Sequence, residues 1–133
     1  VMANLCFWNG ILCKLNDEDY KFANFYFNKT KDNRAISLIE HLKSKNLKTN
    51  KIQWQNNLLS KKELEENFEH VQNFNIKSIN KGYDCSSCDP FLLLITEIFQ
   101  LEIIHQYCGN NIYYKSDKPR KKILFYSNRG HFW

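Results

Sequence analysis

The pattern of apolar residues changes its period after residue 100, and this change constrains the fold more than any other feature of the sequence. PFLLLITEIFQ (90–100) is apolar at most positions, and Asp89 as N-cap with Pro90 at the first helical position is typical of a helix start. The segments that follow are short and rich in β-branched and aromatic residues, and turn formers such as Lys118-Pro119 separate them. They are LEIIHQY (101–107), NIYYK (111–115) and KILFYSN (122–128). We therefore expect a buried helix followed by three strands of a meander.

The segments before this region carry helical signals. Apolar residues recur at helical spacing in CFWNGILCKL (6–15), which predicts a short helix that begins near Cys6. We expect a second helix in NDEDYKFANFYF (16–27), capped by Asn16 or Asp17, with acidic residues in its first turn.

Two more helices are predicted in the middle of the chain. DNRAISLIEHLKSKN (32–46) places its apolar residues on one helical stripe. Ser60 and Glu63 stand at capping-box spacing, which predicts a helix from about 61 to 72. The segment IQWQ (52–55) is too short to assign.

This order of elements predicts an α+β fold, with helices first and then a small, mainly antiparallel β-sheet. The final HFW (131–133) is expected to begin or continue another strand. A length of 133 residues fits one domain, 1–133, without a linker. The composition, 43% hydrophobic and 15% aromatic, is typical of a packed globule.

A formal net charge of +5 admits an acidic partner such as nucleic acid. Basic residues are densest in KSKNLKTNK (43–51) and KSDKPRKK (115–122), and solvated loops explain them better than a binding groove. We therefore expect no nucleic-acid partner, and a basic nucleic-acid module is kept as an alternative. No run of about 18 apolar residues occurs, so we expect no membrane partner.

The cysteines are odd in number and irregular in spacing, which favours reduced thiols in a cytosol-like compartment over a disulfide framework. They are Cys6, Cys13, Cys85, Cys88 and Cys108. Cys85 and Cys88 form a C-x-x-C motif, but no second pair follows at a suitable spacing for zinc. We expect no metal, no other cofactor and no disulfide.

Cys6 and His131 are the candidate catalytic residues. A thiol at the start of a helix is next to the positive end of the helix dipole and to free backbone N–H groups, which stabilise a thiolate and an oxyanion. A histidine on a strand packed against that helix can take the thiol proton and hold the thiolate as an ion pair. The other histidines are weaker candidates, because we expect His105 to pack in the core or at a sheet edge and His41 and His70 to lie on the surface.

The segment ANLCFW (3–8) is similar to a cysteine motif, Asp-Gly-Asn-Cys followed by two large residues and a helix. CDPFLLLITEIFQLEIIHQY, NNIYYK and KILFYSNRGHFW repeat the order of a Leu-rich helix, a strand, a hairpin and an apolar strand that ends near Gly and His. With these motifs the chain resembles the ovarian tumour (OTU) family of cysteine proteases, most of which are deubiquitinases. The resemblance spans nearly the whole chain and is strongest from 88 to 133.

The resemblance implies a papain-like OTU fold, in which a helical lobe packs on the sheet, and a thiol-dependent deubiquitinase that cleaves ubiquitin isopeptide bonds. Cys6 would be the nucleophile, His131 the general base and Asn4 the third catalytic group. Three aromatic residues, Trp8, Phe132 and Trp133, would wall the channel for the substrate tail. The partners would be ubiquitin or polyubiquitin chains, bound by a monomer.

The chain departs from the family pattern at Ala3, which replaces an aspartate, at Leu5, which replaces an asparagine, and at Trp133, which replaces an Asn or Asp. Because Trp cannot accept a hydrogen bond from imidazole, the site needs another orienting group or works as a dyad. These departures favour the alternative of a catalytically silent OTU-like module that binds ubiquitin. Abundant Lys, Asn and Ile indicate an AT-rich genome, typical of a bacterial effector or a viral protein that works in the host cytosol. Cys13 is expected to be a structural thiol.

Overall fold

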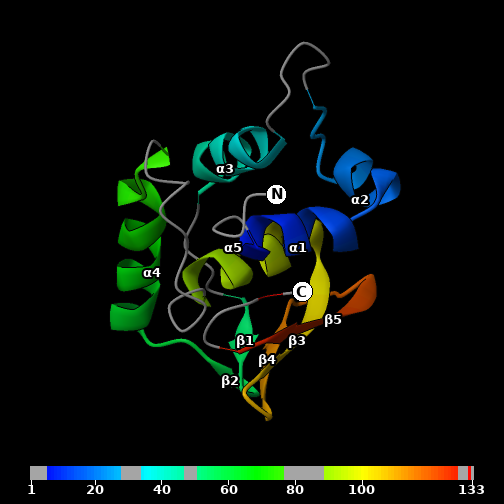
Figure 1. The fold of residues 1–133 in the computed structure, drawn as a ribbon. Coiled ribbons are helices and arrows are strands. Elements are labelled where there is room, and N and C mark those ends of the chain that lie inside the picture. The colour runs from blue at the N-terminus through cyan, green and yellow to red at the C-terminus, as the bar shows by residue number, and fades with distance from the viewer. Residues whose placement is uncertain (1–5, 28–33, 47–50, 77–88, 129–131, 133) are drawn as a thin grey trace.

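Helices and a small sheet form an α+β fold in the computed structural model, which describes residues 6–27, 34–46, 51–76, 89–128 and 132 (Figure 1). The helices are α1 (Cys6–Lys14), α2 (Asp17–Phe22), α3 (Arg34–Ser44), α4 (Lys61–Asn73) and α5 (Asp89–Phe99). The strands are β1 (Gln53–Trp54), β2 (Asn57–Leu58), β3 (Leu101–Tyr107), β4 (Asn110–Lys115) and β5 (Lys121–Ser127).

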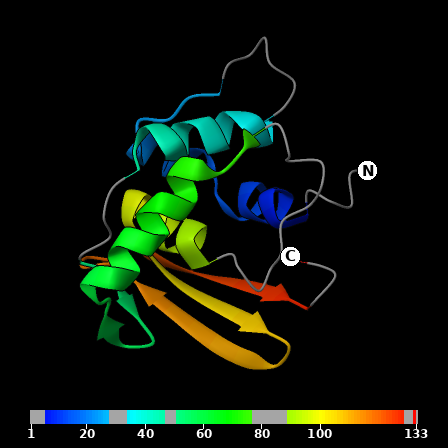
Figure 2. The same ribbon diagram turned by 90° about the vertical axis from the view of Figure 1, so that its left-hand side faces the viewer.

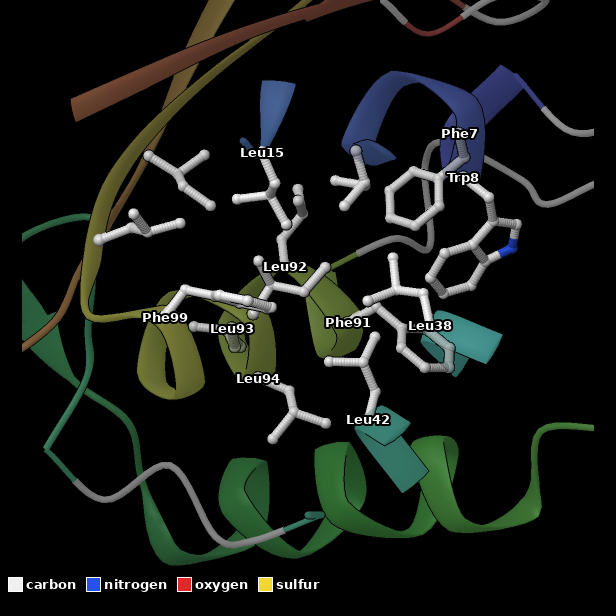
Figure 3. Packing of buried hydrophobic residues seen from close by; sticks show 14 of the residues in the cluster. Phe7, Trp8, Leu15, Leu38, Leu42, Phe91, Leu92, Leu93, Leu94 and Phe99 are labelled. Atoms are coloured by element: carbon white, nitrogen blue, oxygen red, sulfur yellow. The ribbon is translucent and has the colours of Figure 1, made fainter. Parts of the chain in front are cut away.

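Helix α5 is the centre of the core, as its apolar sequence predicts. Its side chains at 91–95 and at Phe99 are at most 2% exposed, so the helix is buried around most of its circumference. Figure 3 shows Leu15 of the α1–α2 turn and Leu38 and Leu42 of α3 directed toward it. Each fully buried side chain of this kind contributes about 1.5–3 kcal/mol to folding, so this single helix organises the apolar interior.

Two predicted helix caps are confirmed. Asn16 caps α2, where its side chain accepts the Asp19 N–H. Ser60 caps α4, where its hydroxyl accepts the Glu63 N–H at 3.1 Å and the Glu63 carboxylate accepts the Ser60 N–H at 2.9 Å. Asp89, by contrast, is the first residue of α5 rather than its cap, so this boundary was predicted one residue too late.

The sheet has the strand order β2-β1-β4-β3-β5, and the predicted meander of β3, β4 and β5 is wrong. β4 is antiparallel to β3, as expected, but β5 runs parallel to β3 along its other side. The segment 116–120 makes this possible by passing across the start of β3. The Ser116 N–H donates to the Leu101 carbonyl at 3.0 Å, and the Arg120 N–H donates to the Gln100 carbonyl at 2.7 Å. These two hydrogen bonds hold the segment against the start of β3 while the chain passes from the β4 side of β3 to the β5 side.

The unassigned segment IQWQ contributes β1, which pairs with β2 in a small hairpin and with β4 in the sheet. The remaining pairs besides β3–β5 are antiparallel, so the expectation of a mainly antiparallel sheet is confirmed. Figure 2 shows the labelled helices of Figure 1 on one side of this sheet. Among the described helices, none is long and apolar enough to cross a membrane.

Candidate functional site

Cys6 is the first residue of α1, which confirms the prediction that it begins a helix. Its thiol is free, and its side chain is partly buried against the core. The first turn of an α-helix has backbone N–H groups without intrahelical acceptors and carries the positive end of the helix dipole. A thiolate at Cys6, or an oxyanion formed on its substrate, would be stabilised by this environment.

Three other residues of the expected site lie outside the part of the chain that the structure describes. They are Asn4 and His131, expected as catalytic groups, and Trp133, expected as a channel wall, so the pairing of Cys6 with His131 stays a prediction. Cys85 and Cys88 of the C-x-x-C motif also lie outside it. Cys13 and Cys108 are free, exposed thiols. The exposure of Cys13 differs from the expectation that it is a structural thiol.

Phe132, the residue after His131 in the sequence, packs against α1. Its ring centroid lies 4.8 Å from that of Phe7, and its side chain is 1% exposed. On the sheet side it lies 5.0 Å from the ring of Phe125 in β5 and 5.4 Å from the ring of His105 in β3. An isolated antiparallel bridge joins it to Ser127. The predicted strand at HFW is thus represented, among the described residues, by this single bridge.

Gly10 makes the contact between α1 and Phe132 possible. A Cβ atom at this position would lie 2.6 Å from Cδ1 and 2.9 Å from Cε1 of the Phe132 ring, closer than carbon atoms can approach. The helix tolerates the glycine, although Gly is less favourable than Ala inside a helix by about 1 kcal/mol. A role for Gly10 was not predicted from the sequence, although a glycine in the middle of a short helix is a signal that can indicate a close contact.

Trp8 and Phe132 do not have the position expected of channel walls. Both side chains are 1% exposed, and Figure 3 shows Trp8 directed from α1 into the core. The Trp8 ring packs edge-on against Phe91 of α5 at a centroid distance of 4.9 Å. Large aromatic side chains are favoured in the core, because burying them removes a large apolar area from water. Their assignment as substrate-binding residues is corrected to a packing role.

His105 is a core residue of β3, which is one of the two positions expected for it from the sequence. It is 1% exposed, and its Nε2 lies 2.6 Å from Oγ of Ser127, which is itself 4% exposed. Burial lowers the pKa of His105 from 6.5 to about 4, so the ring is neutral at pH 7. A neutral imidazole can accept the Ser127 hydroxyl hydrogen or donate to its oxygen, depending on the tautomer.

His41 and His70 were expected on the surface, but both side chains are half-buried. The His41 ring packs against Phe25 at 4.4 Å, and the His70 ring packs against Phe91 at 5.8 Å. Burial lowers the pKa of both rings, and the charge of Lys45 lowers that of His41 further. Charged residues flank both histidines in the sequence, which suggested surface positions. The rings nevertheless pack against aromatic residues of the interior.

Within the described ranges, no group of three or more His, Cys, Asp or Glu side chains is arranged to hold a metal ion. Comparison of the chain with protein-family models, with curated proteins and with solved structures found no match.

Proposed function

We propose that the chain is a cysteine protease of the OTU type that removes ubiquitin from isopeptide-linked substrates. Cys6 is the nucleophile in this proposal, and His131 is the general base. The partner is ubiquitin or a polyubiquitin chain, bound by a monomer in the cytosol of the producing cell or of a host cell.

The observation that carries the proposal is the contact of Phe132 with α1. Phe132 follows His131 directly in the sequence, and consecutive Cα atoms are about 3.8 Å apart. Gly10, which Phe132 touches, lies one helical turn from Cys6, a rise of about 6 Å. The two sequence motifs that resemble the family are thus tied to the same short helix, although they are at opposite ends of the printed sequence.

The chemistry follows from the positions that the proposal assigns. The Cys6 sulfur attacks the carbonyl carbon of the terminal glycine of ubiquitin, while His131 takes the thiol proton. Free N–H groups in the first turn of α1 stabilise the oxyanion of the tetrahedral intermediate. When the carbon–nitrogen bond breaks, His131 protonates the leaving lysine amine. Water, deprotonated by His131, then hydrolyses the thioester and restores the thiol.

A ubiquitin probe with an electrophile in place of its C-terminal carboxylate tests the proposal. The probe reacts where a thiolate is activated and the ubiquitin tail is bound, so it tests the nucleophile, the base and the binding surface together. We expect a covalent adduct with the native chain, detected by mass spectrometry. Cys6→Ala should abolish it because no nucleophile remains, and His131→Ala should slow it at least about 100-fold because no base takes the proton.

Cys13→Ala is the matched control, since Cys13 is a free thiol on the same helix and is exposed. This variant should form the adduct at nearly the native rate. An adduct that survives Cys6→Ala and disappears with Cys13→Ala would refute the assignment of the nucleophile. If the native chain binds ubiquitin without forming an adduct or cleaving diubiquitin, the chain is a silent binding module, which the departures at Ala3, Leu5 and Trp133 favour.

A further inference from the structure

Ser127 is the last residue of β5, and both its side chain and its backbone are held in place. Its hydroxyl oxygen lies 2.6 Å from Nε2 of His105 in β3, and both side chains are buried. Its carbonyl accepts the Cys108 N–H at 3.0 Å. An antiparallel bridge joins it to Phe132. Ser127 therefore connects the interior of the sheet to the residue that packs on α1.

His105 contacts both Ser127 and Phe132. The ring that is hydrogen-bonded to Ser127 lies 5.4 Å from the Phe132 ring, between centroids, and so forms part of the surface on which Phe132 packs. The ring of Phe125 in β5 belongs to the same surface, at 5.0 Å from Phe132. On the other side, Phe132 meets Phe7 of α1 at 4.8 Å. The position of Phe132 between the sheet and α1 thus depends on where the His105 ring lies.

The hydrogen bond between His105 and Ser127 is not needed to join β3 to β5. These strands pair at seven consecutive positions, which is enough to fix their register. An apolar pair would fill the interior without burying polar groups, which is costly. The polar pair adds direction, because a hydrogen bond restricts the relative orientation of the two side chains more than apolar contacts do. We expect such a restriction to matter at the bridge that follows β5.

The position of Phe132 on α1 bears on the proposed active site. Cys6 is the first residue of α1, and Gly10, which Phe132 touches, lies one helical turn further along. In the proposed protease the general base, His131, directly precedes Phe132 in the sequence. A misplacement of about 1 Å in a catalytic group can lower a rate by about 100-fold. Residues that hold Phe132 in place on α1 therefore affect the rate of this site.

We propose that His105 and Ser127 are positioning residues of the proposed active site, because their hydrogen bond holds Phe132 against α1 and so places the base relative to Cys6. This inference rests on the proposed function. Both side chains are buried, so in this role they act through Phe132 and not on the substrate. Their loss should lower the maximal rate of the reaction and leave the binding of ubiquitin unchanged.

Ser127→Ala tests the role of the hydroxyl, and Thr96→Val is its matched control. Thr96 is also buried, and its hydroxyl donates to the Leu92 carbonyl at 2.7 Å, so each variant removes one buried side-chain hydrogen bond. Adduct formation is measured over a range of concentrations of the ubiquitin probe. Ser127→Ala should lower the maximal rate about tenfold without changing the half-saturating concentration, and Thr96→Val should change neither.

His105→Leu and His105→Gln separate positioning from stability. Leucine fits an apolar core but cannot bind the Ser127 hydroxyl, whereas glutamine can donate or accept a hydrogen bond. We expect His105→Leu to react about tenfold more slowly than the native chain and His105→Gln to stay within about threefold of it. The melting temperature of His105→Leu should be at least that of His105→Gln. The slower variant is then not the less stable one, which a purely structural role does not explain.

Amide hydrogen exchange in α1 reports the placement of Phe132 without any activity. In the Ser127→Ala chain, exchange at residues 7–11 should be at least about tenfold faster than in the native chain, and exchange in α4 should be unchanged. If the native chain forms no adduct and this faster exchange is seen, the protease proposal fails and the holding of Phe132 is supported. Equal maximal rates for Ser127→Ala and Thr96→Val, or unchanged exchange in α1, would overturn the positioning role.

Discussion

At the residue scale, the pair of His105 and Ser127 shows how the core of the sheet uses a titratable group. The two side chains project from the paired strands β3 and β5 and meet at 2.6 Å in the interior. An apolar pair would fill the same space, but a hydrogen bond fixes the direction of both side chains. Burial disfavours the charged form of the imidazole and lowers the pKa of His105 to about 4, so the ring is neutral in the folded chain at pH 7.

This lowered pKa makes stability depend on pH. The pKa of His105 is about 4 in the folded chain and 6.5 in the unfolded chain, so between these values the unfolded chain binds the extra proton. The stabilisation is fully present above pH 6.5 and is lost as the pH falls toward 4. Between pH 7 and pH 4.5 the free energy of unfolding should fall by about 2–3 kcal/mol from this residue, measured by urea titration.

His105→Gln is the test variant, because glutamine retains a hydrogen-bonding group and does not titrate. Its free energy of unfolding should change less between pH 7 and pH 4.5 than that of the native chain. His41 and His70 also have lowered pKa values and remain in both proteins, so their contributions cancel in the comparison. Equal pH dependence in the two proteins would contradict the buried, neutral state of His105.

At the scale of elements, Phe132 packs closely against α1 because Gly10 has no side chain. Gly10→Ala places a methyl group 2.6 Å from the Phe132 ring, so the ring or the helix must move. We expect a loss of about 1–3 kcal/mol in the free energy of unfolding, although alanine alone favours a helix. Chemical denaturation gives this value, and the ubiquitin probe should react more slowly with the same variant.

The matched variant is Phe132→Leu, which makes room beside α1. In the double variant the smaller leucine should accommodate the new methyl group, so the two losses should be less than additive by at least about 0.5 kcal/mol. Fully additive losses would show that Gly10 and Phe132 do not interact as described. Slow probe reaction in a fully stable variant would separate an effect on the site from an effect on folding.

The helices were predictable because their signals are local. Asn16 and Ser60 are residues whose side chains cap helices, and each is followed three residues later by an acidic residue that completes a capping box. The course of β5 was not predictable in this way, because a short connection after β4 normally returns the chain beside β4. What decides the path is a set of hydrogen bonds from the connection to the end of α5 and the start of β3, including two from the Arg120 guanidinium to the Phe99 carbonyl of α5.

The candidate site was predictable only in part, for the same physical reason. The position of Cys6 at a helix start follows from spacing along a few residues. The burial of Trp8 depends on α5, and the need for Gly10 depends on Phe132, which are both far away in sequence. Contacts of this kind have no local pattern, so the sequence alone does not show that Trp8, an aromatic residue close to the candidate nucleophile Cys6, packs in the core.

At the scale of the whole molecule, Asp19 joins the helices to the sheet. This carboxylate of α2 is 1% exposed and forms ion pairs with Arg120 at 3.1 Å and Lys121 at 2.7 Å, at the start of β5. Burial raises its pKa, but hydrogen bonds from Lys121, the Asn16 N–H and Arg120 outweigh burial and lower the pKa below its usual value. Asp19 is therefore charged in the folded chain at pH 7.

Asp19→Asn leaves the two cations with a neutral partner and should lower the free energy of unfolding by about 3 kcal/mol, measured by urea titration at pH 7. Asp17→Asn is the matched control, because Asp17 is an exposed acid in the same helix, and it should change stability by less than about 0.5 kcal/mol. Equal effects of the two substitutions would mean that the ion pairs contribute nothing beyond the net charge of α2.

The contact between Gly10 and Phe132 also has a consequence for biosynthesis. A ribosome makes α1 before Phe132, and most residues of the printed sequence lie between the two, so α1 is made long before Phe132 can cover it. Until Phe132 is made, the side of α1 at Phe7 and Gly10 lacks one of its apolar neighbours. An unfinished chain, or one cut before Phe132, therefore presents a hydrophobic surface of the kind that chaperones and proteases recognise. Cells would remove such fragments while sparing chains that contain Phe132.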